Sequence, residues 1–452
     1  MEQARRVRAQ KAEAAGAAAP EQGNLHHRKA GAKKDQDRAK DRDGVLIRAP
    51  AKAVAKDKLR ALMNNNKWAS ERTKRMPASM FSIMDAAIDE ARQKRLELID
   101  LSIGSSDLPA PEAAMKVLRR ATRLSETHGY CLHACTQPLR NAATVQLNKR
   151  YSINLDPEKN IITLIGSQEG FGHLLFAVTD PGDQVLAPDP GYPSYFGATS
   201  VAGLKQVVMP LLEENMFLPD LTAIPSETAE NARAMIISYP NNPTAAVAPA
   251  AFLQEAIDFC LSYDILLIHD FPYVDMVYGD YKAPSVLAQP GGIDIAVELY
   301  SCSKSYHMGG FRIGWAAGNQ DAVQALARVK GAIDFNQYFG IQQAAIAAIT
   351  QPRAATLKAA ALFETRRNVL VDTLNKSGWQ TSLPQASMYV WTRLPSGLTD
   401  SFDFTVNLAK ETGVCLAPGR GFGKRGEGFV RFALVREPDA LVEAVKKIFN
   451  FL

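Results

Sequence analysis

Short apolar segments alternate with amphipathic stretches along most of the chain after Pro77. Several of the apolar segments are apolar at every position, which is typical of strands buried on both faces of a sheet. Stretches between them, such as Ala251–Tyr263, have helical spacing. This rhythm predicts an α/β fold with a mainly parallel sheet sandwiched by helices. The predicted strands are Ile161–Ile165, Val185–Ala187, Val207–Met209, Met235–Ser238, Ile265–Ile268, Val297–Ser301 and Ile313–Ala316.

Helical spacing also predicts helices over Met80–Leu96, over Gln320–Ile333, and from Ile341 to about Ser377. Short strands and helices follow to Leu452, which indicates a smaller α+β domain. We therefore expect four parts: a disordered, Ala-rich basic leader over 1–65, an N-terminal arm over 66–105 that joins the small domain, a large domain over 106–335 and a small domain over 336–452.

Charge is concentrated at one end of the 452-residue chain. Residues 1–62 hold 16 Lys/Arg and 8 Asp/Glu, a balance of +8, so the remainder of the +5 total is −3. The basic leader is therefore no argument that the body binds nucleic acid. Met63 is an alternative start, which would leave the leader outside the protein. Apolar stretches are too short to span a membrane, so we expect a cytoplasmic protein.

Cysteine usage supports the same compartment. The chain has five cysteines, an odd number, which predicts reduced thiols. Cys131 and Cys135 flank His133, but no second Cys/His cluster supplies further ligands, so we expect no metal site.

Polar, aromatic and turn residues follow five of the predicted strands. Ligands of such folds bind at the carboxyl ends of the strands, so these segments are expected to converge on one site. The segments are Gly166–Gly170, Pro188–Tyr195, Ser238–Thr244, His269–Tyr273 and Ser301–Trp315.

In this order and spacing, the set resembles the class I/II aminotransferases of pyridoxal-phosphate fold type I, from about Trp68 to the C-terminus. Within that family the overall similarity is greatest to LL-diaminopimelate aminotransferases. The resemblance implies an enzyme with a large and a small domain, and pyridoxal 5′-phosphate as its cofactor.

The resemblance also implies a role for each strand-end residue. Lys304 would carry the cofactor as a Schiff base and, once freed, move the substrate α-proton. Asp270 would keep the ring nitrogen protonated, so that the ring can act as an electron sink. Tyr273, helped by Asn242, would donate to the phenolic oxygen and lower the pKa of the Schiff base. Tyr192 would stack on the ring.

The phosphate needs backbone N–H groups at a helix N-terminus and a cation. By resemblance, Ser167 and Gln168 supply the helix start, while Ser301 and Arg312 supply a hydroxyl and a guanidinium. Tyr130 resembles the tyrosine that reaches the phosphate of the partner subunit. The active enzyme would then be a homodimer with shared active sites.

Arg431 stands inside an apolar, strand-like run, where an unpaired charge is costly, so its position asks for an anion. By resemblance it binds the substrate α-carboxylate, with Gly104 and Asn242 beside it. The expected substrates are an L-amino acid and a 2-oxo acid such as 2-oxoglutarate, with lysine and diaminopimelate biosynthesis as the favoured pathway. A second acidic group would need another cation, for which Arg420 and basic residues of the partner are candidates.

The sequence departs from the family where glycines are common, at Cys135, Ala245 and Ala386–Ser387. These departures concern loop shape and remove no reacting group. Two other functions stay open. A pyridoxal-phosphate β-lyase would use the same cofactor residues, and its products would distinguish it. A cofactor-binding transcription regulator would carry a winged-helix domain in front, whereas this leader lacks a helix-turn-helix pattern.

Overall fold

The computed structural model describes residues 67–76 and 79–452, which lie in one compact unit. The predictions for the leader and for a start at Met63 fall outside the described residues. Within the described part, no helix is long and apolar enough to cross a membrane.

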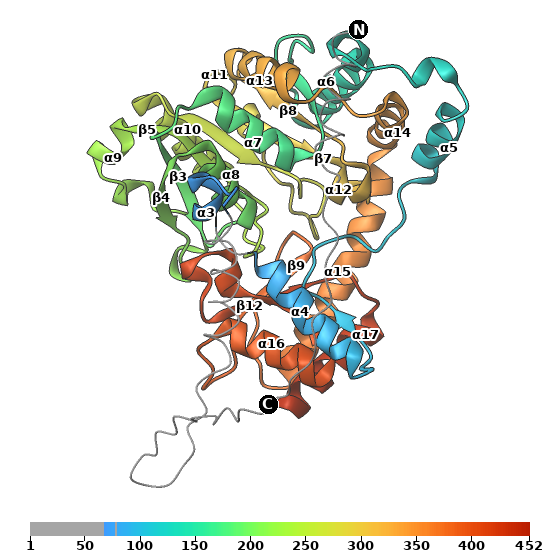
Figure 1. The fold of residues 1–452 in the computed structure, drawn as a ribbon, viewed down its shortest axis with the longest axis vertical. Helices are drawn as coiled ribbons and strands as arrows, with labels where there is room; N and C mark the ends of the chain where they lie inside the picture. The colour runs from blue at the N-terminus through green and yellow to red at the C-terminus, as the bar shows by residue number, and fades with distance from the viewer. Residues whose placement is uncertain (1–66, 77–78) are drawn as a thin grey trace, which may run out of the picture. The chain divides into compact units, whose positions relative to one another are not determined.

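A seven-stranded sheet forms the centre of the upper body in Figure 1, and all seven predicted strands are confirmed. Its strand order is β2-β8-β7-β6-β5-β3-β4, and β8 runs antiparallel to both neighbours while the other pairs are parallel. The strands are β2 (Ile161–Leu164), β3 (Gln184–Asp189), β4 (Lys205–Pro210), β5 (Ala232–Ile237), β6 (Leu266–Asp270), β7 (Ala296–Ser301) and β8 (Gly314–Gly318).

Helices cover both faces of this sheet, because its central strands are apolar on both sides. One core packs the sheet against α7 (Ser167–Val178), α8 (Pro193–Ala202) and α13 (Gln320–Ile333). The other core packs it against α6 (Gln137–Tyr151), α10 (Ala250–Tyr263) and α14 (Phe339–Ile349). Shorter helices in this body are α5 (Glu112–Ala121), α9 (Ser226–Glu230), α11 (Gly292–Ile295) and α12 (Cys302–Ser305).

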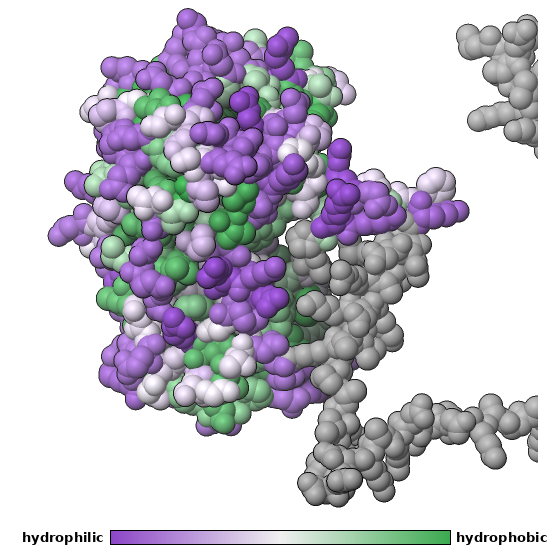
Figure 2. All heavy atoms as spheres, turned by 90° about the vertical axis from the view of Figure 1, so that its left-hand side faces the viewer, coloured by the Kyte–Doolittle hydropathy of each residue, from purple (hydrophilic) through white to green (hydrophobic). Residues whose placement is uncertain are grey.

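Edge strand β4 opens with exposed Lys205, a residue type that discourages pairing with another chain. Seen from the side of β4 and α9, hydrophilic and hydrophobic residues interleave over the surface (Figure 2).

A second layered region with its own core occupies the lower part of Figure 1. Strands β11, β12 and β9 form an antiparallel sheet in that order, and β1 pairs in parallel with β10. The strands are β1 (Ile99–Asp100), β9 (Tyr389–Arg393), β10 (Val414–Cys415), β11 (Ala417–Pro418) and β12 (Phe429–Ala433). The helices are α4 (Met80–Gln93), α15 (Arg353–Lys376), α16 (Ser401–Thr412) and α17 (Pro438–Phe451); α3 (Glu71–Arg75) precedes them in the chain.

The single helix predicted from Ile341 to about Ser377 is wrong. The structure has two helices, α14 and α15, separated at Pro352. Proline lacks the N–H that a continuing helix requires, and it disfavours helical backbone in the residue before it. The apolar spacing continues across the break, which is why periodicity alone did not reveal it.

The expectation of five reduced thiols is also wrong. Cys131 and Cys135 form a disulfide, while Cys260, Cys302 and Cys415 are free and buried. The four-residue spacing falls at the short 3-10 helix His133–Thr136, which brings the two Cα atoms to 5.2 Å, within bonding range.

Two of the departures from family glycines keep a backbone that suits glycine. Ala245 has φ 58° and Ser387 has φ 74°, both in the left-handed region. The Ser387 hydroxyl is also buried without a hydrogen-bond partner among the described residues.

Ser387→Gly should therefore raise stability. The change removes an unfavourable φ, which costs ~1–2 kcal/mol, and an unsatisfied hydroxyl, against a smaller entropic cost of glycine. We expect a net gain of about 1–2 kcal/mol in denaturant unfolding. Exposed Ser377, with φ −86°, is the matched control, since Ser377→Gly should give no gain. A lower midpoint for Ser387→Gly would contradict the strain argument.

Candidate active site

The Asp270 carboxylate, at the end of β6, has one oxygen that accepts a hydrogen bond and one without a partner among the described residues. Tyr195, in the first turns of α8, donates its phenol to Asp270 Oδ2 at 2.7 Å. Asp270 Oδ1 is buried and has no partner among the described residues. Burial raises the pKa of Asp270 to about 6, against the lowering effect of the Tyr195 hydrogen bond and the charges of His269 and Lys304. The protonated ring nitrogen of pyridoxal phosphate, the cofactor that the resemblance implies, would satisfy the free oxygen of Asp270.

A helix N-terminus and a guanidinium meet at the end of β2. Gly166 caps α7 with φ 82°, a backbone conformation that favours glycine, and a Cβ there would lie 2.4 Å from Arg312 Nη2, so a larger residue would displace the guanidinium. Ser167 and Gln168 are the first residues of α7. Their N–H groups and the Arg312 side chain are groups that could together hold an anion.

Two more predicted residues, Ser301 and Tyr192, lie at the end of β7 and in the segment after β3. Ser301, the last residue of β7, caps α12 by accepting a hydrogen bond from the Ser303 N–H at 3.1 Å. The Tyr192 phenol donates to Gln168 Oε1 at 3.1 Å, which ties the predicted stacking ring to the start of α7. The Tyr192 and Tyr195 rings meet edge to face at 5.8 Å.

Lys304 follows β7 on the short helix α12. Its Nζ donates to the Gly104 carbonyl and lies 5.9 Å from the centroid of the Tyr273 ring. The lysine thus joins the arm segment after β1 to the segment after β6.

Tyr273 in turn contacts the second region, because its hydroxyl lies 2.8 Å from that of Tyr389 at the start of β9. A Cβ at residue 104 would lie 1.9 Å from the Tyr389 hydroxyl. Glycine is therefore required at 104 for Tyr389 to reach Tyr273.

Arg431, on β12, is buried and already arranged for an anion. Its Nη1 donates to Asn242 Oδ1 at 2.6 Å and its Nη2 to the Ser102 carbonyl at 2.7 Å. Its guanidinium lies between the rings of Tyr389 and Phe422, 4.1 and 4.6 Å from their centroids. Arg431 Nε is buried without a partner among the described residues. Only neutral groups hold this charge, so a carboxylate would complete the site.

The structure does not bring two of the named candidates into this cluster. Tyr130 is 88% exposed, and its ring lies edge to face with Phe335 at 5.8 Å. Arg420 pairs with Glu427 at 3.5 Å on a partly exposed surface.

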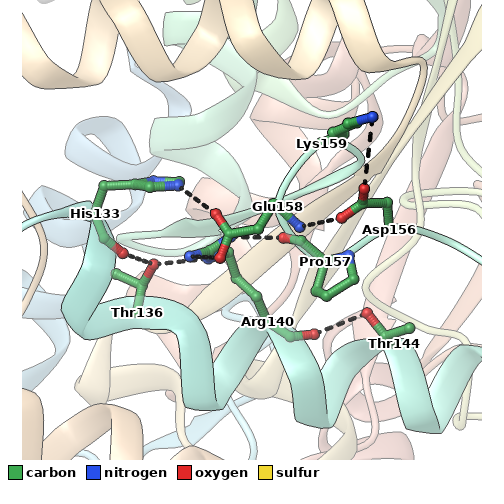
Figure 3. A network of polar contacts seen from close by, with 8 residues as sticks. All are labelled: His133, Thr136, Arg140, Thr144, Asp156, Pro157, Glu158 and Lys159. Atoms are coloured by element: carbon green, nitrogen blue, oxygen red, sulfur yellow. Dashed lines mark hydrogen bonds and ion pairs between the residues drawn. The ribbon is translucent and has the colours of Figure 1, made fainter.

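A buried arginine anchors the segment that follows Tyr130 (Figure 3). Arg140 donates to Thr136 Oγ1 at 3.0 Å and to the Pro157 carbonyl at 2.7 Å, and it forms an ion pair with Glu158 at 2.8 Å. These bonds join the start of α6 to the loop before β2. The Tyr130 segment is therefore fixed at its base while the Tyr130 side chain stays exposed.

Tyr195 and Tyr389 are site residues that the sequence reasoning did not assign. Tyr195 is the last residue of a segment selected for its position after a strand, so its presence near the site was predictable. Its bond to Asp270 was not, because the two residues are 75 positions apart. Tyr389 closely follows Ala386–Ser387, where the sequence departs from the family glycines, but its position near Lys304 and Arg431 depends on packing between distant segments.

The chain belongs to the aminotransferase class I and II family, whose profile matches residues 97–448. It is 39% identical over 379 residues to LL-diaminopimelate aminotransferase of Moorella thermoacetica, covering 84% of this chain and 97% of the relative. It is 45% identical to the solved structure of a probable N-succinyldiaminopimelate aminotransferase from Thermus thermophilus, with a TM-score of 0.80, covering 83% and 100% of the two chains. Substrate-bound BacF from Bacillus subtilis is 31% identical, with a TM-score of 0.82 and coverage of 85% and 98%.

These similarities confirm the predicted fold type I architecture and the assignment as a transaminase. Membership of the family implies pyridoxal phosphate as cofactor and amino acids and 2-oxo acids as substrates. The residues present fit that cofactor, since the free oxygen of Asp270 and the cradle at Gly166 match its ring nitrogen and its phosphate.

Proposed function

We propose that the protein transfers an amino group from an L-amino acid to a 2-oxo acid, with pyridoxal 5′-phosphate held by Lys304 as a Schiff base. The proposal rests on one observation above all: the charge of Lys304 acts on Asp270, a carboxylate with a free oxygen, and its amine lies by the Tyr273 ring. Through Tyr389, Tyr273 is connected to Arg431, a buried arginine without an anionic partner among the described residues. The bound cofactor supplies an electron sink for the carbanion formed at the substrate α-carbon.

The protein's own groups then have separate tasks. Asp270 holds the ring nitrogen in its charged form, and Tyr195 keeps that carboxylate oriented. Tyr273 and Asn242 donate to the phenolic oxygen, and Asn242 is free to do so because only its carbonyl oxygen is used by Arg431. Tyr192 covers one ring face. The phosphate is held by Ser167, Gln168, Ser301 and Arg312.

Arg431 and Lys304 act on the substrate itself. Arg431 binds the α-carboxylate in a bidentate fashion, with Gly104 and Asn242 beside it, and this fixes the α-carbon over the lysine. When it is not bonded to the cofactor, the Lys304 amine would serve as the general base that accepts the substrate α-proton, and its conjugate acid would be the proton donor for the second half of the transfer.

We propose LL-diaminopimelate as amino donor and 2-oxoglutarate as acceptor in lysine biosynthesis, on the strength of relatives that share 37–39% identity over most of their length. A second donor, N-succinyl-diaminopimelate, is favoured by the 45% identical Thermus structure. The two candidate donors differ at the end far from the reacting amino group. Free diaminopimelate carries an ammonium group there, whereas the succinylated compound carries an amide and an added carboxylate.

A donor panel tests the proposal. The enzyme reconstituted with pyridoxal phosphate is mixed with LL-diaminopimelate, N-succinyl-diaminopimelate, glutamate or aspartate, and conversion of the bound aldehyde to its amine form is followed by absorbance. We expect conversion with a diaminopimelate compound and stoichiometric glutamate when 2-oxoglutarate is added. Pyruvate with ammonia or a thiol as products would instead identify a β-lyase, and no conversion with any donor would reject the transaminase proposal.

The pH dependence of cofactor binding should reveal Asp270. Because the pKa of Asp270 is about 6, its carboxylate becomes protonated as the pH falls below that value and can no longer pair with the charged ring nitrogen. We expect affinity for pyridoxal phosphate to fall by up to about tenfold per pH unit below the pKa. Asp270→Asn should bind weakly at every pH and lack this step. An identical pH profile in both proteins would exclude Asp270 as the titrating group.

We further propose a cytoplasmic homodimer with shared active sites. An exposed apolar cluster surrounds the Tyr130 segment and consists of Tyr130, Leu132, Ile333 and Phe335. Burying such a cluster against a second copy would place Tyr130 near the partner's phosphate cradle.

We also propose the division into an arm over 66–105, a large domain over 106–335 and a small domain over 336–452, with α14 extending across to pack on α5 and α6.

Mixed dimers can test whether Tyr130 serves the partner. A Lys304→Ala subunit paired with a Tyr130→Phe subunit has one site with both defects and one site with neither. We therefore expect activity to return when the two inactive or weakened variants are unfolded and refolded together. Activity equal to the mean of the separate variants would show that Tyr130 does not act across the interface.

A further inference from the structure

Tyr389 occupies the centre of the candidate site, although nothing in the proposed chemistry requires it. Its hydroxyl lies 2.8 Å from the Tyr273 hydroxyl, and Arg431 lies against its ring at 4.1 Å. Both phenols are buried, so neither exchanges its partner with bulk water. Residue 104 must be glycine to admit the Tyr389 hydroxyl, which shows how closely the arm is fitted to this contact.

The two phenols differ in their electrostatic surroundings, while the contact between them allows either to donate. Burial raises the pKa of Tyr389, but the charges of Lys304 and Arg431, together with the hydrogen bond to Tyr273, outweigh it and leave that pKa below its ordinary value. Burial and the neighbouring Tyr389 hold the pKa of Tyr273 well above its ordinary value. Tyr273 has a single hydroxyl proton, so when that proton goes to the ring oxygen of the cofactor, the 2.8 Å bond between the two phenols needs Tyr389 as its donor.

A hydroxyl that accepts one hydrogen bond has its own proton left to direct elsewhere. With its oxygen bonded to Tyr389, Tyr273 cannot turn its proton toward that neighbour. The proton is then available to the ring oxygen that Tyr273 is proposed to contact.

We propose that Tyr389 is a positioning residue of the reaction: it donates to Tyr273 and thereby directs the Tyr273 proton to the phenolic oxygen of the cofactor. This inference rests on the proposed function of Tyr273 and Lys304. It assigns to the small-domain strand β9 a part in setting the pH at which the lysine-linked cofactor gains its proton.

The test is a pH titration of the visible absorbance of the reconstituted protein without substrate. A donor to the phenolic oxygen lowers the proton affinity of the lysine-linked cofactor, so removing the donor should raise the titration midpoint. We expect Tyr389→Phe to raise the midpoint by roughly half a pH unit and Tyr273→Phe to raise it further. Because Tyr389 acts through Tyr273, the double variant should match Tyr273→Phe alone.

Tyr278→Phe is the matched control, since Tyr278 is a buried phenol of the same core that donates to the Ser387 carbonyl outside the site. Its midpoint should equal that of the wild type. A wild-type midpoint in Tyr389→Phe, or additive shifts in the double variant, would overturn the inference. A raised KM with an unmoved midpoint would overturn it too, since Tyr389 would then contact substrate. Failure of the proposed function looks different: the wild type would show no titrating band that Lys304→Ala abolishes.

Discussion

Lys304→Ala should abolish the lysine-linked cofactor absorbance and lower kcat by roughly a thousandfold or more, as expected when a general base and a covalent anchor are lost together. Lys304 is the residue that joins the Gly104 carbonyl to the Tyr273 ring, whereas the Arg431 guanidinium is bonded to Asn242 and to the Ser102 carbonyl.

Pyridoxal phosphate should still bind to Lys304→Ala through Asp270 and the cradle at Gly166, which a shift of the cofactor spectrum toward that of the free aldehyde would report. Lys159→Ala, at an exposed lysine, is the control and should match the wild type. If Lys304→Ala retained both the band and turnover, another amine would hold the cofactor and the proposed chemistry would fail.

The inner strands of the large sheet could be predicted from the sequence because they are buried along most of their length. A strand covered on both faces is apolar throughout, so β3 and β5 could be recognised without knowledge of their neighbours. The same reasoning failed between α14 and α15. There the apolar spacing continues, and only the chemistry of Pro352 ends one helix and starts the next.

The candidate site, like the fold, has a part that the sequence predicts and a part that it does not. The topology of a parallel sheet brings strand ends together, so Asp270 and Lys304 could be placed in one site from their positions after β6 and β7. Contacts between segments far apart in the chain could not be predicted. The Tyr273–Tyr389 pair spans 116 positions and the Arg431–Ser102 bond spans 329, and both depend on how the second region packs against the sheet.

Arg431→Ala should lower kcat/KM for α-amino acids by roughly a hundredfold to a thousandfold, with most of the effect in KM. The guanidinium is the only cation that the described structure places between Asn242 and the arm carbonyl of Ser102. Its removal takes away both hydrogen bonds to a carboxylate and leaves those two acceptors without their donor. The cofactor band should remain, because Lys304 and Asp270 are untouched.

Two further variants extend this test. One asks whether the charge or the shape of the Arg431 side chain matters, and the other asks whether Arg420 binds a second carboxylate of the substrate. Arg431→Lys keeps a positive charge but loses the paired N–H donors of the guanidinium, so it should recover only part of the affinity for the substrate α-carboxylate. Arg420→Ala removes the cation that sequence reasoning offered for a second acidic group, yet Arg420 pairs with Glu427 on the surface. We expect unchanged KM for diaminopimelate and for glutamate in Arg420→Ala. If Arg420→Ala lost affinity for diaminopimelate alone, Arg420 would have to leave Glu427 and bind the distal carboxylate. An unaltered KM in Arg431→Ala would show that Arg431 does not bind the α-carboxylate.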